Sequence, residues 1–64
     1  MCEANAYIYK NGEETLYLEG VDVLIPEGDT IFLKNLFGEQ KTFHGRIKEM
    51  SLVKHKILLE EKKP

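Results

Sequence analysis

Apolar and polar residues alternate over short stretches of this chain, the pattern expected of β-strands that bury one face. Glycine, proline or asparagine separates most of these stretches, and such residues end strands and form turns. The segments predicted as strands are Ala4–Tyr9, Thr15–Glu19, Val21–Ile25, Thr30–Asn35, Lys41–Ser51 and Lys56–Leu59. Because Lys41–Ser51 is long enough for one strand or two, we expect six or seven short antiparallel strands.

The segments between the predicted strands contain residues that are typical of tight turns. Asn11-Gly12 lies between two strand-like runs, and both residues tolerate the positive φ angles of a tight hairpin. Pro26-Glu27-Gly28-Asp29 has a proline that fixes φ and a glycine for a positive-φ position, so it predicts a second tight turn. Val53-Lys54-His55 is expected to be a further short turn.

Two features inside this pattern predict details of the fold. Gly45 interrupts the longest strand segment, where a glycine typically marks a bulge or a bend at a barrel corner. Leu36 and Phe37 are apolar residues in a connection, and we expect them to fold inward. Residues 47–59 place some apolar side chains at helical spacing, so a helix there is the minority alternative.

The pattern as a whole predicts an all-β fold, a small SH3-like barrel of six or seven short antiparallel strands. We assign residues 1–60 to a single small β-barrel domain and residues 61–64 to a charged C-terminal tail. A 64-residue chain buries only ~60% of the surface that its unfolded form exposes, and such domains usually need a disulfide, a metal or a partner subunit. One cysteine cannot form an internal disulfide, which leaves a metal, a second copy of the chain, or both.

Charge and hydropathy exclude several classes of protein. The net charge is -2, from 9 basic and 11 acidic residues, without the basic stripe of a nucleic-acid-binding protein. The longest apolar runs, Val23–Ile25 and Ile57–Leu59, are far too short to span a membrane. The first residues do not form a signal peptide, and the thiol is free, so we expect a cytoplasmic protein.

Catalysis finds little support in the sequence. Ser51 is the only serine, and nothing near it indicates an activated nucleophile. The five glycines are isolated and form no phosphate-binding loop. We therefore predict that the protein is not an enzyme and has no catalytic residues.

RNA binding is the alternative function, since small β-barrels often bind RNA through stacked aromatic side chains. The candidates for stacking are Tyr7, Tyr9, Tyr17, Phe32, Phe37 and Phe43. Half of these positions are expected to face the core, and the acidic balance opposes contacts with phosphate. A nucleic-acid partner is therefore the less favoured prediction.

Cys2 is the candidate metal ligand. A thiolate at position 2 can chelate a metal together with a nearby main-chain nitrogen, either the Cys2 amine if Met1 is removed or an amide if it stays. The amine and the thiol have ordinary pKa values near ~8 and ~8.5, so a divalent cation can displace both protons near neutral pH. Two such chelates in a two-fold dimer supply two nitrogens and two sulfurs, a set that suits Ni(II) or Cu(II) in tetragonal geometry.

Other roles for these residues stay open. A single cysteine is also commonly a small buried hydrophobe. His44 lies on the polar side of its strand and His55 lies between Lys54 and Lys56, so both are expected to be solvated and neither is assigned a role.

Several short motifs, taken in order, resemble the CooT family. They are Met1-Cys2, Asn11-Gly12 followed by acidic residues and Leu16, Gly20-Val21, Leu36–Glu39, Gly45–Glu49 and Leu52–Leu59. CooT proteins are small nickel-binding accessory proteins of carbon monoxide dehydrogenase maturation, also classed as predicted RNA-binding proteins. The resemblance implies an SH3-like barrel and a homodimer that holds one Ni(II) between two chains through Cys2.

The predicted function is therefore that of a cytoplasmic, homodimeric nickel metallochaperone without catalysis. Its partners would be a second copy of the chain and, as client, carbon monoxide dehydrogenase or its maturation proteins. The alternative is a small RNA-binding β-barrel module. The Irving–Williams order predicts that Cu(II) binds such a site at least as well as nickel does.

Overall fold

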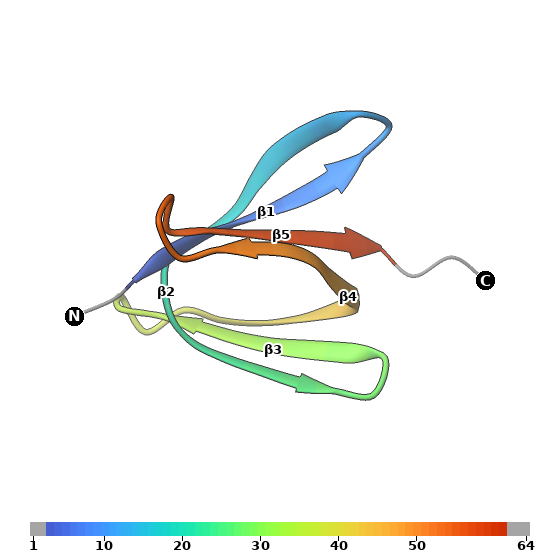
Figure 1. Cartoon of the computed structure of the whole chain (residues 1–64). Helices are drawn as coiled ribbons and strands as arrows, with labels where there is room; N and C mark the ends of the chain where they lie inside the picture. Colours follow the sequence, from blue (N-terminus) through green and yellow to red (C-terminus); the bar gives the residue numbers. More distant parts are fainter. Residues whose placement is uncertain (1–2, 62–64) are drawn as a thin grey trace.

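The computed structural model describes residues 3–61, which form an all-β fold whose strands pair into a closed barrel (Figure 1). Among these residues there are five strands, each paired with the next along the chain. Their bounds are β1 (Ala4–Lys10), β2 (Glu13–Glu27), β3 (Thr30–Asn35), β4 (Gln40–Ser51) and β5 (Lys56–Glu61). In this part of the chain no helix is long and apolar enough to cross a membrane.

The predicted count of six or seven strands is wrong, because two predicted strands are one. β2 runs without a break through Gly20, whose φ of 68° bends the strand instead of ending it. At this bend Val21 pairs with Ala4 on one side and with Asn35 on the other. One long strand can therefore pair first with β1 and then with β3, which replaces a separate strand and turn.

The prediction that all strands are antiparallel is wrong for one pair. Four of the five pairings are antiparallel, but β1 and β5 run parallel, with Ala6 opposite Ile57 and Ile8 opposite Leu59. The odd number of strands explains this result, because alternating directions leave the first and the last strand pointing the same way when the barrel closes. The likeness to SH3 domains stays a prediction.

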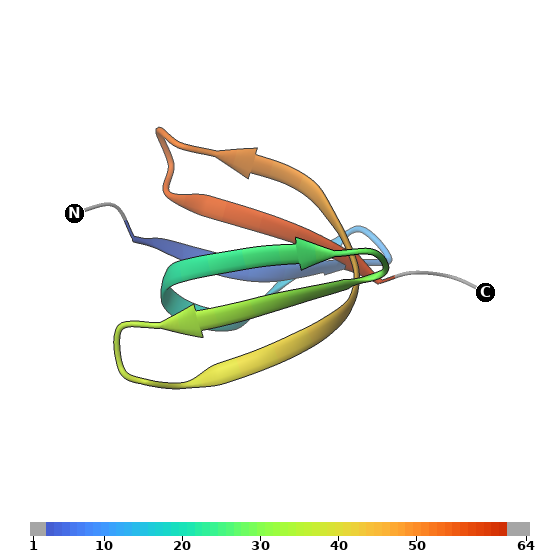
Figure 2. The same cartoon turned by 90° about the horizontal axis from the view of Figure 1, so that it is seen from below.

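Gly45 lies at the corner where β4 changes partners, as its position in the sequence indicated. His44 is the last residue of β4 paired with β3, and Gly45 is the first paired with β5. Figure 2 shows β4 curving from the one strand to the other. A Cβ atom at position 45 would meet the backbone carbonyl of Glu60, so the two strands approach closely only because residue 45 has no side chain.

The core is formed by residues of all five strands. Its buried hydrophobic side chains are Ala6, Leu18, Val21, Ile31, Leu33, Phe43, Ile57, Leu58 and Leu59. Leu33 and Leu59 are 0% exposed, and complete burial of such a side chain contributes about 2 kcal/mol. The buried positions alternate in β3, at Ile31, Leu33 and Asn35, as the period of two predicts, whereas the buried residues of β5 are consecutive.

In the connection after β3, the apolar side chains are exposed and a polar one is buried, which is the opposite of the prediction. Leu36 and Phe37 do not fold inward, since 43% and 73% of their surfaces are exposed. The buried residue is Asn35, whose Oδ1 accepts hydrogen bonds from the backbone N–H groups of Phe37 and Glu39 at 3.1 and 2.8 Å. A polar side chain therefore satisfies the backbone of the loop from inside the barrel, and the apolar side chains face solvent.

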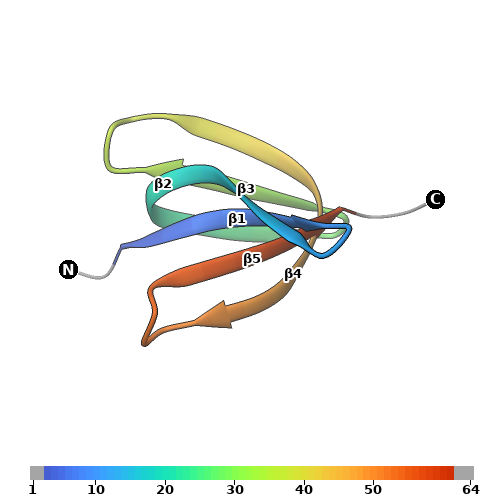
Figure 3. The same ribbon diagram turned by 90° about the horizontal axis from the view of Figure 1, so that it is seen from above.

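The connections lie at two opposite ends of the barrel. The start of β1, the β3–β4 loop and the β4–β5 turn are at one end, and the β1–β2 and β2–β3 turns are at the other (Figures 1–3). β5 continues to Glu61, one residue beyond the predicted domain boundary. Residues 62–64, the rest of the predicted tail, are outside the described part of the chain.

Candidate metal centre at the start of β1

Cys2, the predicted metal ligand, lies outside the described residues, which begin at Glu3. The start of β1 is held by hydrogen bonds of Asn5 to the turn before β5 and to β2. The Asn5 backbone N–H donates to the His55 carbonyl oxygen at 2.9 Å. The Asn5 Oδ1 accepts from the Gly20 N–H at 3.1 Å. The described part of the chain therefore begins close to the bend of β2 and to the β4–β5 turn.

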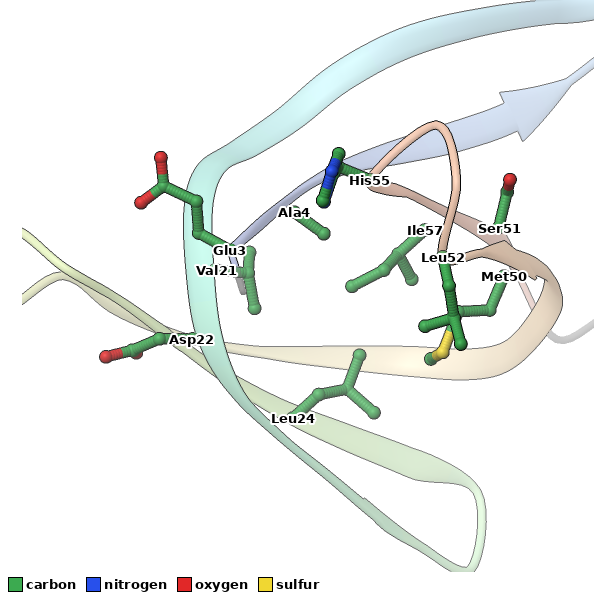
Figure 4. Close-up of a pocket in the computed structure, with 10 residues that line it drawn as sticks. All are labelled: Glu3, Ala4, Val21, Asp22, Leu24, Met50, Ser51, Leu52, His55 and Ile57. Carbon is green, nitrogen blue, oxygen red and sulfur yellow. The ribbon is translucent and has the colours of Figure 1, made fainter. Parts of the chain in front are cut away.

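An apolar pocket of about 270 Å³ adjoins this point (Figure 4). It lies between the start of β1, the bend of β2 and the end of β4 with the turn that follows. The residues that line it are Glu3, Ala4, Val21, Asp22, Leu24, Met50, Ser51, Leu52, His55 and Ile57. Figure 4 shows Leu24, Ile57 and Leu52 facing the pocket, while the carboxylates of Glu3 and Asp22 point away from it.

The structure places the two histidines at opposite ends of the barrel. His55 lines the pocket and adopts a φ of 52°, a left-handed conformation that non-glycine residues rarely adopt. His44 is exposed on β4, opposite Thr30 at the β2–β3 turn. Within residues 3–61, no three His, Cys, Asp or Glu side chains gather as a group that could hold a metal ion. The histidines therefore do not form a joint site.

A second, polar hollow of about 160 Å³ lies on the outer surface of β4 and β5. It is lined by Glu14, Glu49, Ser51, Lys54, Lys56 and Leu58. Lys56 forms a salt bridge with Glu14, and this hydrogen bond raises the pKa of the Lys56 ammonium above its ordinary value. The salt bridge in this hollow links β2 to β5.

Among the six aromatic residues considered for stacking, Phe43 is buried, Phe37 is 73% exposed and the other four are half-buried. Phe43 is buried, and its ring meets that of Tyr17 edge-on at 5.6 Å. Each tyrosine has a lysine ammonium over its ring, Lys56 on Tyr7, Lys48 on Tyr9 and Lys41 on Tyr17, at 4.5 to 5.2 Å. A lysine in this position competes with an RNA base for one face of the tyrosine ring.

Comparison with known proteins identifies the family. Residues 1–60 match the family described as CO dehydrogenase accessory protein CooT. The chain belongs to the CooT family. This result confirms the resemblance carried by the short motifs of the sequence.

A solved structure and two curated relatives agree with this assignment. The crystal structure of a protein assigned as CooT from Carboxydothermus hydrogenoformans is 45% identical in sequence and superposes with a TM-score of 0.90. That match covers 97% of this chain and 100% of the other. An uncharacterized protein of Methanocaldococcus jannaschii is 40% identical over 60 residues, which are 94% of this chain and 98% of that protein. An uncharacterized protein of Archaeoglobus fulgidus is 37% identical over 43 residues, 67% of this chain and 96% of that protein.

Cys2 stays a predicted metal ligand, and sequence reasoning did not predict the pocket that Glu3 lines. The pocket unites residues from three separate segments, and no local pattern reveals such a meeting. One signal was present: Leu52 and Val53 are adjacent apolar residues at a predicted turn, where polar residues are usual.

Proposed function

We propose that this CooT-family protein is a nickel-binding accessory protein, a cytoplasmic metallochaperone that acts as a homodimer without catalysis. One Ni(II) would be held between two chains through the Cys2 thiolates. The client would be a nickel enzyme such as carbon monoxide dehydrogenase, in line with the description of the family. Nickel is here the cargo of the protein.

The observation that carries this proposal is the position of Cys2 in the chain. Cys2 is the only cysteine and immediately precedes Glu3, at the rim of an apolar pocket. The hydrogen bonds of Asn5 to His55 and Gly20 hold the start of β1 in place.

The chemistry of the donors favours nickel or copper. Thiolate and main-chain nitrogen from each of two chains give four donors, which suit the tetragonal geometry of Ni(II). A single chain supplies only half of this set, which is why the proposal requires a dimer. Each chain would supply only two ligands. A client could therefore take up the metal ion by replacing these few ligands with its own.

A titration of the untagged protein with Ni(II), followed by thiolate-to-nickel absorption, tests the proposal. We expect the band to saturate at one nickel per two chains and to be absent from the Cys2→Ser variant. The matched control is His55→Asn, because His55 lines the same pocket and asparagine also tolerates its positive φ. This control should retain the band.

Two results would contradict the proposal. One is a nickel band that survives Cys2→Ser, which would assign the metal to other ligands. The other is the absence of any band in a wild-type protein whose circular dichroism shows an intact β-fold.

A further inference from the structure

β5 buries side chains on both faces of the sheet. Ile57 and Leu59 belong to the core inside the barrel, and Leu58, between them, points to the outer face. Leu58 is nevertheless only 5% exposed. It is paired with Glu49 on β4 and with Tyr7 on β1, and these strands lie on either side of β5 (Figure 3). The polar hollow on this surface therefore has an apolar floor, formed by Leu58.

An ion pair closes one side of this hollow. Lys56 of β5 forms a salt bridge with Glu14 of β2, although β1 lies between these two strands. The Lys56 ammonium lies 5.2 Å from the centre of the Tyr7 ring on β1. The salt bridge thus reaches across β1 beside Tyr7 and forms a wall, and the charges of its two members are matched within the protein.

The other side of the hollow carries charges that are not matched. It is lined there by Glu49 and Ser51 of β4 and by Lys54 of the turn that follows. In the described part of the chain, neither Glu49 nor Lys54 forms a salt bridge. The Ser51 Oγ accepts a hydrogen bond from the Lys54 backbone N–H at 3.2 Å, which leaves the hydroxyl proton of Ser51 available to a ligand.

A ligand that matches these groups carries one positive and one negative charge. An ammonium group donates hydrogen bonds to the Glu49 carboxylate, and a carboxylate accepts them from the Lys54 ammonium and the Ser51 hydroxyl. Charge-assisted hydrogen bonds of this kind are stronger than neutral ones. A ligand with a single charge would leave either Glu49 or Lys54 without a partner. The volume of about 160 Å³ limits the ligand to a small molecule.

We propose that this hollow binds a small free amino acid, with its ammonium group on Glu49, its carboxylate on Lys54 and Ser51, and its side chain against Leu58. A free amino acid fits better than the end of a peptide, because a peptide end brings only one of the two charges. The site goes beyond the proposed function, and it depends neither on a metal nor on a second chain. It is also distinct from the apolar pocket, although Ser51 lines both.

Titration of the full chain with L-alanine, followed by amide NMR chemical shifts, tests the site. We expect saturable shifts at the amides of Ser51, Lys54, Lys56 and Leu58. Propionate, which lacks the ammonium group, and L-alaninamide, which lacks the carboxylate, are the comparison ligands. Each should bind with a Kd at least about tenfold higher than that of L-alanine, because each lacks one charge-assisted contact.

Two variants test the residues that carry the charges. Glu49→Gln and Lys54→Gln should each raise the Kd of L-alanine at least about tenfold. The matched controls are Glu27→Gln and Lys34→Gln, which make the same changes of charge at exposed residues that do not line the hollow. These controls should leave the Kd unchanged. All four positions are exposed, so the fold should persist, and the amide spectra will check this in each variant.

Several results would overturn the inference. One is the absence of saturable shifts with L-alanine. Propionate that binds as tightly as L-alanine would make the hollow a simple anion site, and L-alaninamide that does so would make it a simple cation site. Binding that survives both Glu49→Gln and Lys54→Gln would place the amino acid elsewhere. Because the titration uses no metal, each of these results leaves the proposed nickel site untouched.

Discussion

At the scale of single residues, Asn35 shows how a small barrel fixes a loop. It is the one polar residue among the described positions that is fully buried, at 1% exposure. Its Nδ2 donates to the Glu19 carbonyl at 3.1 Å and to the Glu39 carboxylate at 2.7 Å, while its Oδ1 accepts from two loop N–H groups. All four hydrogen bonds join β2, β3 and the loop that presents Leu36 and Phe37.

We predict that Asn35→Ala lowers the free energy of unfolding by about 3 kcal/mol, because four partners lose a hydrogen bond worth about 1 kcal/mol each and some regain water. Urea denaturation will measure the change. Thr30→Ala is the control, since it removes a single exposed hydrogen bond to Glu27 and should cost under about 1 kcal/mol. Equal losses in the two variants would contradict this account of Asn35.

At the scale of the elements, β2 and β4 build the barrel by changing partners along their length. β2 pairs with β1 and then with β3, and β4 pairs with β3 and then with β5. Each strand bends at a glycine, but for different reasons. Gly20 adopts a positive φ, whereas Gly45 provides space for the backbone of Glu60.

We predict that Gly45→Ala costs about 3 kcal/mol, because the new methyl group would press against backbone that cannot move aside without separating β4 from β5. Thermal and urea denaturation will measure it. Gly12→Ala is the comparison: its φ is positive but its surroundings are open, so it should cost only about 1 kcal/mol. If Gly45→Ala proved the milder change, the close approach at the corner would be wrong.

The sequence predicted the strands well and their connections less well. The hairpin at Asn11-Gly12, the turn at Gly28 and the corner at Gly45 follow from local chemistry, which a sequence states directly. The union of two predicted strands at Gly20 depends on pairings with β1 and β3, which are distant in sequence. The orientation of Leu36 and Phe37 depends on the buried side chain of Asn35, so the hydrophobic pattern alone misled the prediction.

At the scale of the whole molecule, the two ends of the barrel differ in chemistry. One end carries polar turns, and the other carries the pocket, the exposed side chains of Leu52 and Val53 and Glu3, the first described residue. A 64-residue core is thin, and the proposed association of two copies would bury additional apolar surface while bringing two metal ligands together. Under the proposed function, one two-chain arrangement would supply both this additional burial and the metal site.

Native mass spectrometry of the untagged, nickel-loaded protein is the measurement that tests the central claim most directly. It weighs the chains and the metal of one complex together. The account predicts a species of two chains with one nickel ion, which is replaced by metal-free protein in the Cys2→Ser variant. Nickel bound to single chains only, or two-chain nickel complexes that persist without the Cys2 thiol, would contradict it.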